Sequence, residues 1–165
     1  MISVGDKAPD FTGQAVVLNA EGQGFDYGEL SLAGLLEKAE KGLVLYFYPR
    51  AMTPGCTKEA CDFRDSLQTW RTAGYNVVGV SPDPLSRLER FAERDGLSFP
   101  LISDVEHVIM SAYGAWGEKK NYGKLVTGTI RSTFVINPDM TVAVALRNVR
   151  ATGHVARLRE QLGID

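Results

Sequence analysis

The chain has 165 residues, of which 44% are hydrophobic and 23% charged, a composition typical of one globular domain over residues 1–165. Its formal net charge of −2 argues against a nucleic-acid or anionic-membrane partner, because both require a cationic surface. The N-terminus lacks the pattern of a secretory signal, and apolar runs such as Leu43–Tyr48 are too short to span a bilayer. A cytoplasmic protein is expected, although a processed organellar protein would have the same features.

The hydrophobic pattern predicts strands alternating with helices. The run Leu43–Tyr48 is apolar throughout, as in a central strand that is covered on both faces. Ser132–Ile136 and Val142–Leu146 flank an Asn-Pro-Asp turn, which predicts an antiparallel hairpin. The other predicted elements are strands over Phe11–Leu18, Phe25–Tyr27, Asn76–Ser81 and Pro100–Ser103, and helices over Ser31–Lys41, Pro54–Ala73, Leu85–Arg94, Val105–Tyr113 and Gly153–Leu162.

This order of elements predicts the fold class. Strands that alternate with helices form a parallel core, and the late hairpin adds antiparallel strands at one side. We therefore expect an α/β protein with a thioredoxin-like fold, in which helices flank a central mixed sheet and a β extension precedes it.

The two cysteines, Cys56 and Cys61, are five positions apart. A pair this sparse is not the framework of a disulfide-rich secreted domain. A metal site is also a poor interpretation, because the only histidines, His107 and His154, are not in zinc-binding spacing, and no role is assigned to them. Taken alone, the cysteines fit two small buried side chains as well as a chemical site.

The segment before Cys56 favours the chemical interpretation. Thr53 can cap a helix through its hydroxyl, Pro54 suits the first helical position, and Gly55 leaves room for a ligand near the backbone. Cys56 then falls in the first turn, where free N–H groups and the helix dipole favour an anion. Such a position favours the thiolate, which is the nucleophilic form of cysteine.

The sequence around these residues resembles the peroxiredoxins. Pro49-x3-Thr53-x2-Cys56 matches their active-site signature, and Thr53–Thr57 followed by Glu59-Ala60-Cys61 is similar to the Q-type (bacterioferritin-comigratory) subfamily. The resemblance extends over nearly the whole chain, through further segments that match in the same order. These are Gly5–Phe11, Tyr46–Pro49, Gly79–Ser81, Leu101–Asp104, Tyr113–Lys119 and Arg131–Ile136.

The resemblance implies a role for each matched position. Cys56 matches the peroxidatic cysteine and Cys61 the resolving cysteine. Arg131 matches the active-site arginine, and Thr53 the hydroxyl that contacts the peroxide. The remaining matches are Pro49, which shields the thiolate, Glu59, which helps to orient the arginine, and Gly55, which with Thr53, Arg131 and Glu59 would line the substrate site.

The implied activity is a peroxidase without cofactor or metal that reduces hydrogen peroxide and organic hydroperoxides. Thioredoxin or a similar dithiol donor would recycle a Cys56–Cys61 disulfide. A thiol–disulfide oxidoreductase and a redox-sensing binding protein are the alternatives, although the Cys-x-x-Cys motif of the former is absent. The chain lacks the Gly-Gly-Leu-Gly element of decameric relatives, so a monomer or weak dimer is expected. Its connection Gly22–Gly42 is longer than usual in the family.

Overall fold

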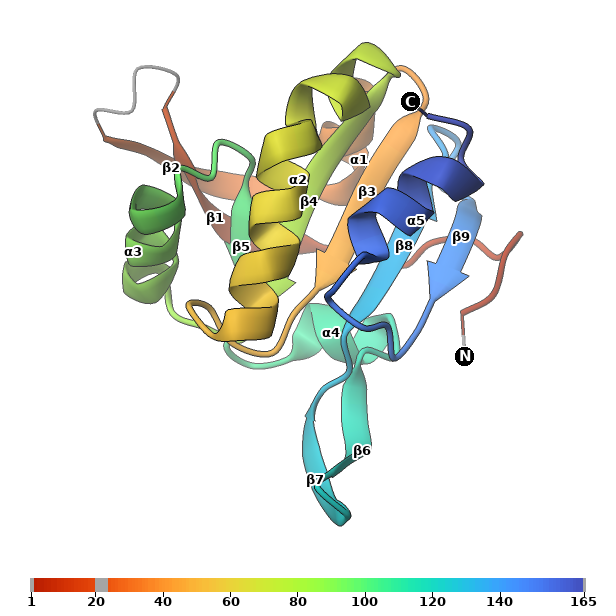
Figure 1. Ribbon diagram of the computed structural model, residues 1–165. Coiled ribbons are helices and arrows are strands. Elements are labelled where there is room, and N and C mark those ends of the chain that lie inside the picture. Colours follow the sequence, from red (N-terminus) through yellow and green to blue (C-terminus); the bar gives the residue numbers. More distant parts are fainter. Residues whose placement is uncertain (1, 20–23, 165) are drawn as a thin grey trace.

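The computed structural model describes residues 2–19 and 24–164, and Figure 1 shows a twisted sheet with helices on both faces. The helices are α1 (Leu32–Glu37), α2 (Pro54–Thr72), α3 (Leu85–Asp95), α4 (Val108–Ala112) and α5 (His154–Gln161). The strands are β1 (Thr12–Leu18), β2 (Phe25–Ser31), β3 (Gly42–Phe47), β4 (Tyr75–Ser81), β5 (Leu101–Ser103), β6 (Trp116–Asn121), β7 (Lys124–Thr129), β8 (Ser132–Ile136) and β9 (Val142–Leu146).

Seven strands form one mixed sheet in the order β2-β1-β5-β4-β3-β8-β9. β3, β4 and β5 are parallel, whereas β8 and β9 add antiparallel strands at one side and β1 and β2 at the other. Every residue of β3 is buried, as its apolar run predicts for a central strand. The thioredoxin-like α/β fold with an N-terminal β extension is therefore confirmed.

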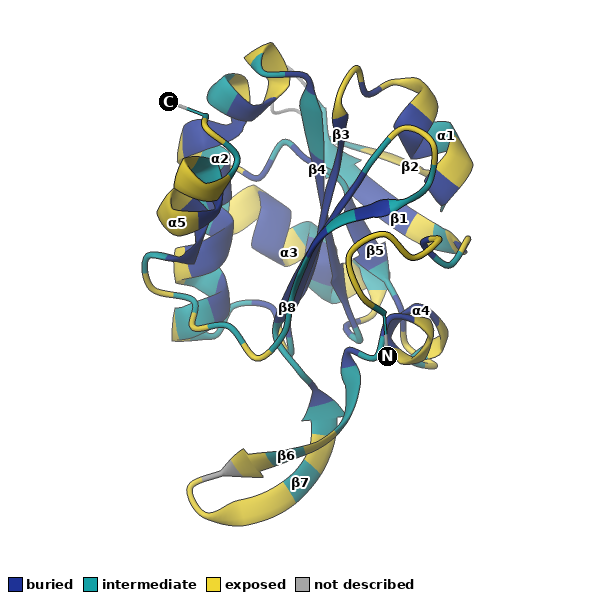
Figure 2. Cartoon of the chain, turned by 90° about the vertical axis from the view of Figure 1, so that its right-hand side faces the viewer, coloured by how far each residue is buried: buried dark blue, intermediate teal, exposed yellow. Residues whose placement is uncertain are grey.

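Each face of the sheet carries its own apolar core. On one face α2, α3 and α5 bury side chains such as Phe63, Phe91 and Leu158, and on the other α1 and α4 bury Leu32 and Met110. Figure 2 shows this distribution, with buried residues concentrated in the central strands and on the sheet-facing sides of the helices. The C-terminal ends of the parallel strands β3, β4 and β5 lie at the same end of the sheet, which is where open α/β sheets bind ligands.

The structure adds one element that the sequence pattern did not predict. β6 and β7 form a separate antiparallel hairpin that projects from the body of the fold (Figure 1). Tyr122 and Gly123 both have positive φ, +53° and +81°, which fits the two-residue turns of tight hairpins. The strands are mostly polar and face solvent on both sides, so they lack the hydrophobic alternation by which a half-buried strand is predicted.

Most predicted boundaries agree with the structure to within a few residues. The helix predicted over Val105–Tyr113 begins only at Val108, because His107 has a left-handed backbone with φ +61°. The strand predicted over Phe25–Tyr27 continues to Ser31. In the predicted long connection Gly22–Gly42, the part from Gly24 onward contains β2 and α1, whereas residues 22 and 23 lie outside the described residues. Among the described residues, no helix is both long and apolar enough to cross a membrane.

Candidate active site

The loop that leads from β3 into α2 is held by the neighbouring β4–α3 connection. The N–H of Ala51 donates to Asp83 Oδ2 at 2.7 Å, and the carbonyl of Ala51 accepts from Arg87 Nη2 at 2.7 Å. Asp83 and Arg87 are themselves paired at 3.1 Å. Both polar groups of the Ala51 backbone are thus fixed just before Met52, a non-glycine residue with a left-handed φ of +66°. Pro49, half-buried, precedes this fixed point.

Thr53 occupies the N-cap position of α2, but its side chain does not cap the helix, so that part of the sequence prediction is wrong. Its hydroxyl donates instead to the carbonyl of Arg50 at 2.8 Å, while its own carbonyl accepts the first helical hydrogen bond from Thr57 N–H. A hydroxyl has one proton and two lone pairs. Because the proton is used toward Arg50, the oxygen of Thr53 is left with acceptor capacity alone.

Cys56 is 1% exposed and lies in the first turn of α2, and a guanidinium from a distant part of the chain reaches its sulfur. Arg131, between β7 and β8, donates from Nη2 to Cys56 Sγ at 3.3 Å. Its Nη1 donates to Glu59 Oε1 at 2.6 Å. Burial alone would lower the pKa of Arg131, but Glu59 and the Cys56 sulfur raise it. One permanently charged group therefore bridges the thiol and a fully buried carboxyl group.

Gly55 allows this arrangement because it has no side chain. A Cβ at this position would stand 3.3 Å from Arg131 Nη2 and 3.7 Å from Ala151 Cβ. The first distance is tighter than an ordinary contact, so the guanidinium would have to shift by a few tenths of an ångström, whereas the second is an ordinary van der Waals contact. The guanidinium thus lies directly against the backbone of the helix N-terminus, where free N–H groups also attract an anion.

Behind Arg131 lies a buried polar cluster. Glu59 is 0% exposed, and burial raises the pKa of its carboxyl group to about 7, although Arg131 acts in the opposite direction. His154, at the start of α5, places Nε2 4.0 Å from Glu59 Oε2 and 2.8 Å from Thr133 Oγ1 of β8. Burial, with Arg157 and Arg131, lowers the pKa of the His154 imidazole to about 4. His154, whose role the sequence did not indicate, thus lies against the site through Glu59, and Thr133 holds the imidazole from the other side.

Cys61 lies more than one helical turn beyond Cys56, and both cysteines are free thiols. α2 is continuous from Pro54 to Thr72, so the two residues are on an intact helix. Burial raises the pKa of the Cys61 thiol. In this reduced form the two sulfurs belong to different surroundings: Cys56 faces Arg131, while Cys61 is only half-buried on the helix surface.

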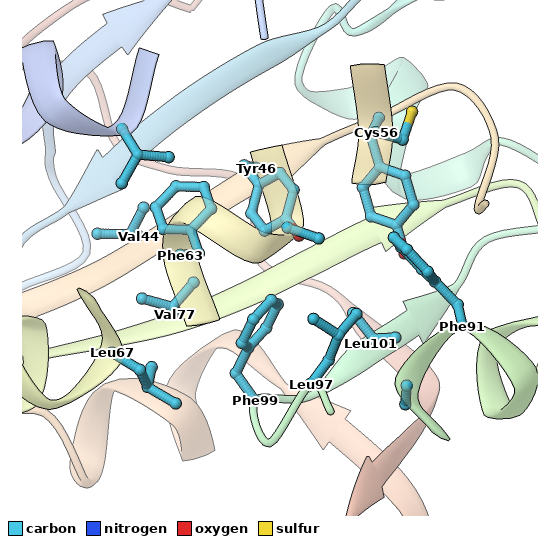
Figure 3. Packing of buried hydrophobic residues seen from close by; sticks show 14 of the residues in the cluster. Val44, Tyr46, Cys56, Phe63, Leu67, Val77, Phe91, Leu97, Phe99 and Leu101 are labelled. Carbon is cyan, nitrogen blue, oxygen red and sulfur yellow. The ribbon is translucent and has the colours of Figure 1, made fainter. Parts of the chain in front are cut away.

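Cys56 lies at one end of the apolar cluster beneath α2. Figure 3 shows it beyond the rings of Tyr46 and Phe63, while Phe91 from α3 covers the adjoining part of the cluster. Tyr46 and Phe63 stack at 4.6 Å between ring centroids. Cys56 itself is 1% exposed, so its interaction with Arg131 takes place largely away from water, which strengthens it. Among the described residues, no group of three or more histidine, cysteine or acidic side chains is placed to hold a metal ion.

The structure brings together Cys56, Gly55, Glu59 and Arg131. Comparison with known proteins shows the family to which a chain with this fold belongs. The model of the AhpC/TSA family matches residues 4–145. A relative from Mycobacterium tuberculosis is 49% identical over 163 residues, which are 99% of this chain and 96% of the relative. Peroxiredoxin Bcp of Bacillus subtilis is 40% identical over 161 residues, 98% of this chain and 95% of its own.

Solved structures give the same result. Xanthomonas campestris peroxiredoxin Q is 37% identical with a TM-score of 0.74, over 82% of this chain and 84% of that chain. The peroxidoxin BcpB of Mycobacterium tuberculosis is 32% identical with a TM-score of 0.77, over 99% of this chain and 97% of that chain.

The chain therefore belongs to the AhpC/TSA family of peroxiredoxins, which are thiol-dependent peroxidases with a thioredoxin-like fold. Within this family it groups with the Q-type, or bacterioferritin-comigratory, proteins.

Proposed function

We propose that Cys56 is the peroxidatic nucleophile and Cys61 the resolving thiol of a thioredoxin-recycled peroxidase. The observation that supports this most directly is the 3.3 Å hydrogen bond from Arg131 Nη2 to Cys56 Sγ. A guanidinium keeps its positive charge at physiological pH, so Arg131 stabilises the thiolate form of Cys56 before peroxide reacts. The N-terminal position of Cys56 in α2 acts in the same direction.

In the first step the Cys56 thiolate attacks the terminal oxygen of hydrogen peroxide or an organic hydroperoxide. A sulfur–oxygen bond forms, the oxygen–oxygen bond breaks, and the leaving oxygen takes the electron pair and then a proton. Arg131 and the N–H groups at the start of α2 stabilise the charge on the leaving oxygen, and Thr53 accepts a hydrogen bond from the peroxide O–H. The products are water or an alcohol and the Cys56 sulfenic acid.

In the second step Cys61 attacks the sulfenic acid, water leaves, and a Cys56–Cys61 disulfide forms. A dithiol donor, thioredoxin or a protein like it, then reduces this disulfide by thiol–disulfide exchange. The continuous helix between the two cysteines separates them in the reduced form. Residues five apart on a regular helix have Cα atoms roughly 8.6 Å apart, whereas disulfides need less than about 7 Å. We infer that the first turns of α2 unwind before the disulfide forms.

Peroxide-dependent oxidation of reduced thioredoxin by the wild type, Cys56→Ser and Cys61→Ser tests this proposal. The wild type should turn over, and Cys56→Ser should consume no peroxide, because a hydroxyl is a far weaker nucleophile than a thiolate. Cys61→Ser should react once and stop at the sulfenic acid. Retention of most activity by Cys56→Ser would contradict the assignment of the nucleophile, and full turnover by Cys61→Ser would contradict that of the resolving thiol.

A further inference from the structure

Glu59 Oε2 is a buried polar atom without a hydrogen bond from the residues that the structure describes. The other oxygen of the carboxyl group, Oε1, is satisfied by Arg131 at 2.6 Å. The polar atom recorded near Oε2 is His154 Nε2 at 4.0 Å, and His154 is 3% exposed. An ionised carboxylate with an unsatisfied buried oxygen is costly, whereas a protonated carboxyl group or a charged imidazole would remove much of that cost.

The charges of the cluster also favour one additional proton on Glu59 or His154. Arg131 is its permanent cation, and it contacts both the Cys56 sulfur and Glu59. If Cys56 and Glu59 were both ionised and His154 neutral, the one cation that contacts them, Arg131, would face two anions. Two further cations act on the cluster without such a contact: Lys119 of β6 on Cys56 and Arg131, and Arg157 of α5 on His154. One additional proton on Glu59 or His154 balances the thiolate. When Cys56 becomes a neutral sulfenic acid, Arg131 and an ionised Glu59 balance each other without it.

We propose that Glu59 and His154 together hold one proton while Cys56 is a thiolate, and that the pair releases this proton when Cys56 is oxidised. The inference deepens the proposed function and rests on it. The first step then needs no proton from solvent. The thiolate and the hydroperoxide become a sulfenic acid and an alkoxide or hydroxide, and this anion takes up one proton. The pair releases one proton at the same time, so the net proton uptake of the step is zero. Sulfur is oxidised by two electrons, and the peroxide oxygens are reduced.

The groups around the pair make the proton respond to Cys56. The Cys56 sulfur and Glu59 contact the same guanidinium, so they lie no more than about 8 Å apart, and unit charges at that distance shift a titration midpoint by more than one pH unit at an effective dielectric constant of ~20. The burial-raised pKa of Glu59, about 7, places the change near neutral pH. The other titratable groups that act on the pair are Arg131, Asp62 of α2, Arg157 of α5, and Tyr46 and Tyr48 from β3 and its end.

Nuclear magnetic resonance titration tests the proposal without peroxide. Two reduced samples differ in one atom: Cys61→Ser, which keeps Cys56, and Cys56→Ser/Cys61→Ser, which cannot form a thiolate. The ¹⁵N chemical shifts of the His154 ring and the ¹³C chemical shift of the Glu59 carboxyl group, followed against pH, show on which group the proton lies and at which pH it is lost. The chain has two histidines, and the ring signals that disappear in His154→Gln are thereby assigned to His154 rather than to His107. We expect the midpoint of the pair to be more than one pH unit higher when Cys56 is present. Equal midpoints would overturn the proposal.

A proton count during one turnover provides the second measurement. Cys61→Ser is mixed with peroxide in weakly buffered indicator solution, at a pH chosen from the ultraviolet absorbance of the thiolate so that Cys56 is ionised before mixing. Cys61→Ser should take up much less than one proton from solution per Cys56 oxidised. Glu59→Gln/Cys61→Ser, which lacks the proton of the pair, should take up about one. Equal uptake of about one proton by both would overturn the proposal. Failure of Cys56 to react at all would instead contradict the peroxidase assignment, and the titration would remain valid.

Discussion

Arg94 of α3 donates a 2.7 Å hydrogen bond to Thr57 Oγ1, in the first turn of α2. This contact connects the segment that the proposed disulfide requires to unwind with α3, a neighbouring helix that contains neither cysteine. Any opening of α2 around Cys56 has to break it, together with the burial of Glu59 and Ala60. The contact therefore contributes to the barrier between the reduced helix and the form in which Cys61 can reach Cys56.

Replacing Arg94 with Met should accelerate formation of the Cys56–Cys61 disulfide after the sulfenic acid has formed. Loss of one net hydrogen bond, about 0.5–1.5 kcal/mol, predicts a roughly 2- to 10-fold faster resolving step. Rapid-mixing tryptophan fluorescence with a single equivalent of peroxide measures this rate. Arg90→Met, exposed on the same helix, is the matched control. An unchanged rate in Arg94→Met would mean that the contact is already lost before resolution.

Unwinding itself should be visible by hydrogen exchange. Across residues 56–61 we expect the hydrogen-bonded amides, from Thr57 onward, to be protected in the reduced protein and to exchange much faster after oxidation, while the second half of α2, anchored by Phe63, Leu67 and Trp70, stays protected. Mass spectrometry of peptides covering both halves of the helix measures the two redox states side by side. Equal protection of residues 56–61 in both states would contradict the intramolecular disulfide and favour an intermolecular resolving thiol.

Arg131→Met should slow the reaction of Cys56 with peroxide by at least ~10²-fold, the usual effect of losing one charge-stabilising donor. Both of its side-chain contacts, to Cys56 Sγ and to Glu59 Oε1, are lost in this variant. Arg131→Lys should recover little, because an ammonium group cannot bridge two partners in the plane of a guanidinium. Stopped-flow kinetics with hydrogen peroxide gives the rate constants. Arg71→Met, exposed near the far end of α2, should react at the wild-type rate.

Gly55→Ala should slow the same reaction, because the new Cβ would stand 3.3 Å from Arg131 Nη2 and shift the guanidinium by a few tenths of an ångström relative to the sulfur. The backbone at Gly55 is helical, so the substitution does not strain the chain itself. We expect a roughly 10-fold loss, corresponding to about 1.4 kcal/mol of weakened stabilisation. Gly28→Ala, where a Cβ would contact nothing within 4 Å, is the control. A wild-type rate in Gly55→Ala would show that the guanidinium adapts to the methyl group.

Glu59 and His154 should affect the pH dependence of stability in opposite directions. Burial raises the Glu59 pKa from 4.5 to about 7, so its stabilising contribution is present below pH 4.5 and is lost as the pH rises through 7. Burial lowers the His154 pKa from 6.5 to about 4, so its contribution is present above pH 6.5 and is lost as the pH falls through 4. Between about pH 4.5 and 6.5 the two effects oppose each other.

His154→Gln should therefore make the free energy of unfolding decrease with rising pH in that window, by up to about 1.4 kcal/mol per pH unit relative to wild type. Glu59→Gln should have the opposite slope. Urea unfolding followed by circular dichroism at several pH values measures both, and the double variant should return to the wild-type slope. Parallel curves for all four proteins would show that neither group changes its protonation on unfolding.

The sequence predicted the elements that are buried and regular, and it missed what depends on tertiary contacts. The apolar run of β3 and the Thr-Pro-Gly-Cys start of α2 both carry strong local signals. Arg131 is 75 residues from Cys56 and could be assigned to the site only through the family resemblance. No local sequence pattern indicates that the start of β8 lies beside the start of α2. His154 gave no signal, since its partner Thr133 comes from β8 and Glu59 from α2. The Thr53 cap was wrong because its side chain turns toward the carbonyl of Arg50, to which the hydroxyl donates, and makes no hydrogen bond with the N–H groups of the first helical turn.

The hydrogen bonds that hold the backbone of Ala51 limit how far the chain can move when α2 opens. Asp83 and Arg87 hold the chain before Met52, and Phe63 anchors it beyond Cys61, so the segment that opens is tethered at both ends. Its conformational search is limited to about ten residues, and loops of that length close in about 10–100 ns. The helix should thus re-form almost at once after the disulfide is reduced. Encounter with the donor, rather than recovery of the active site, would then set the time between turnovers.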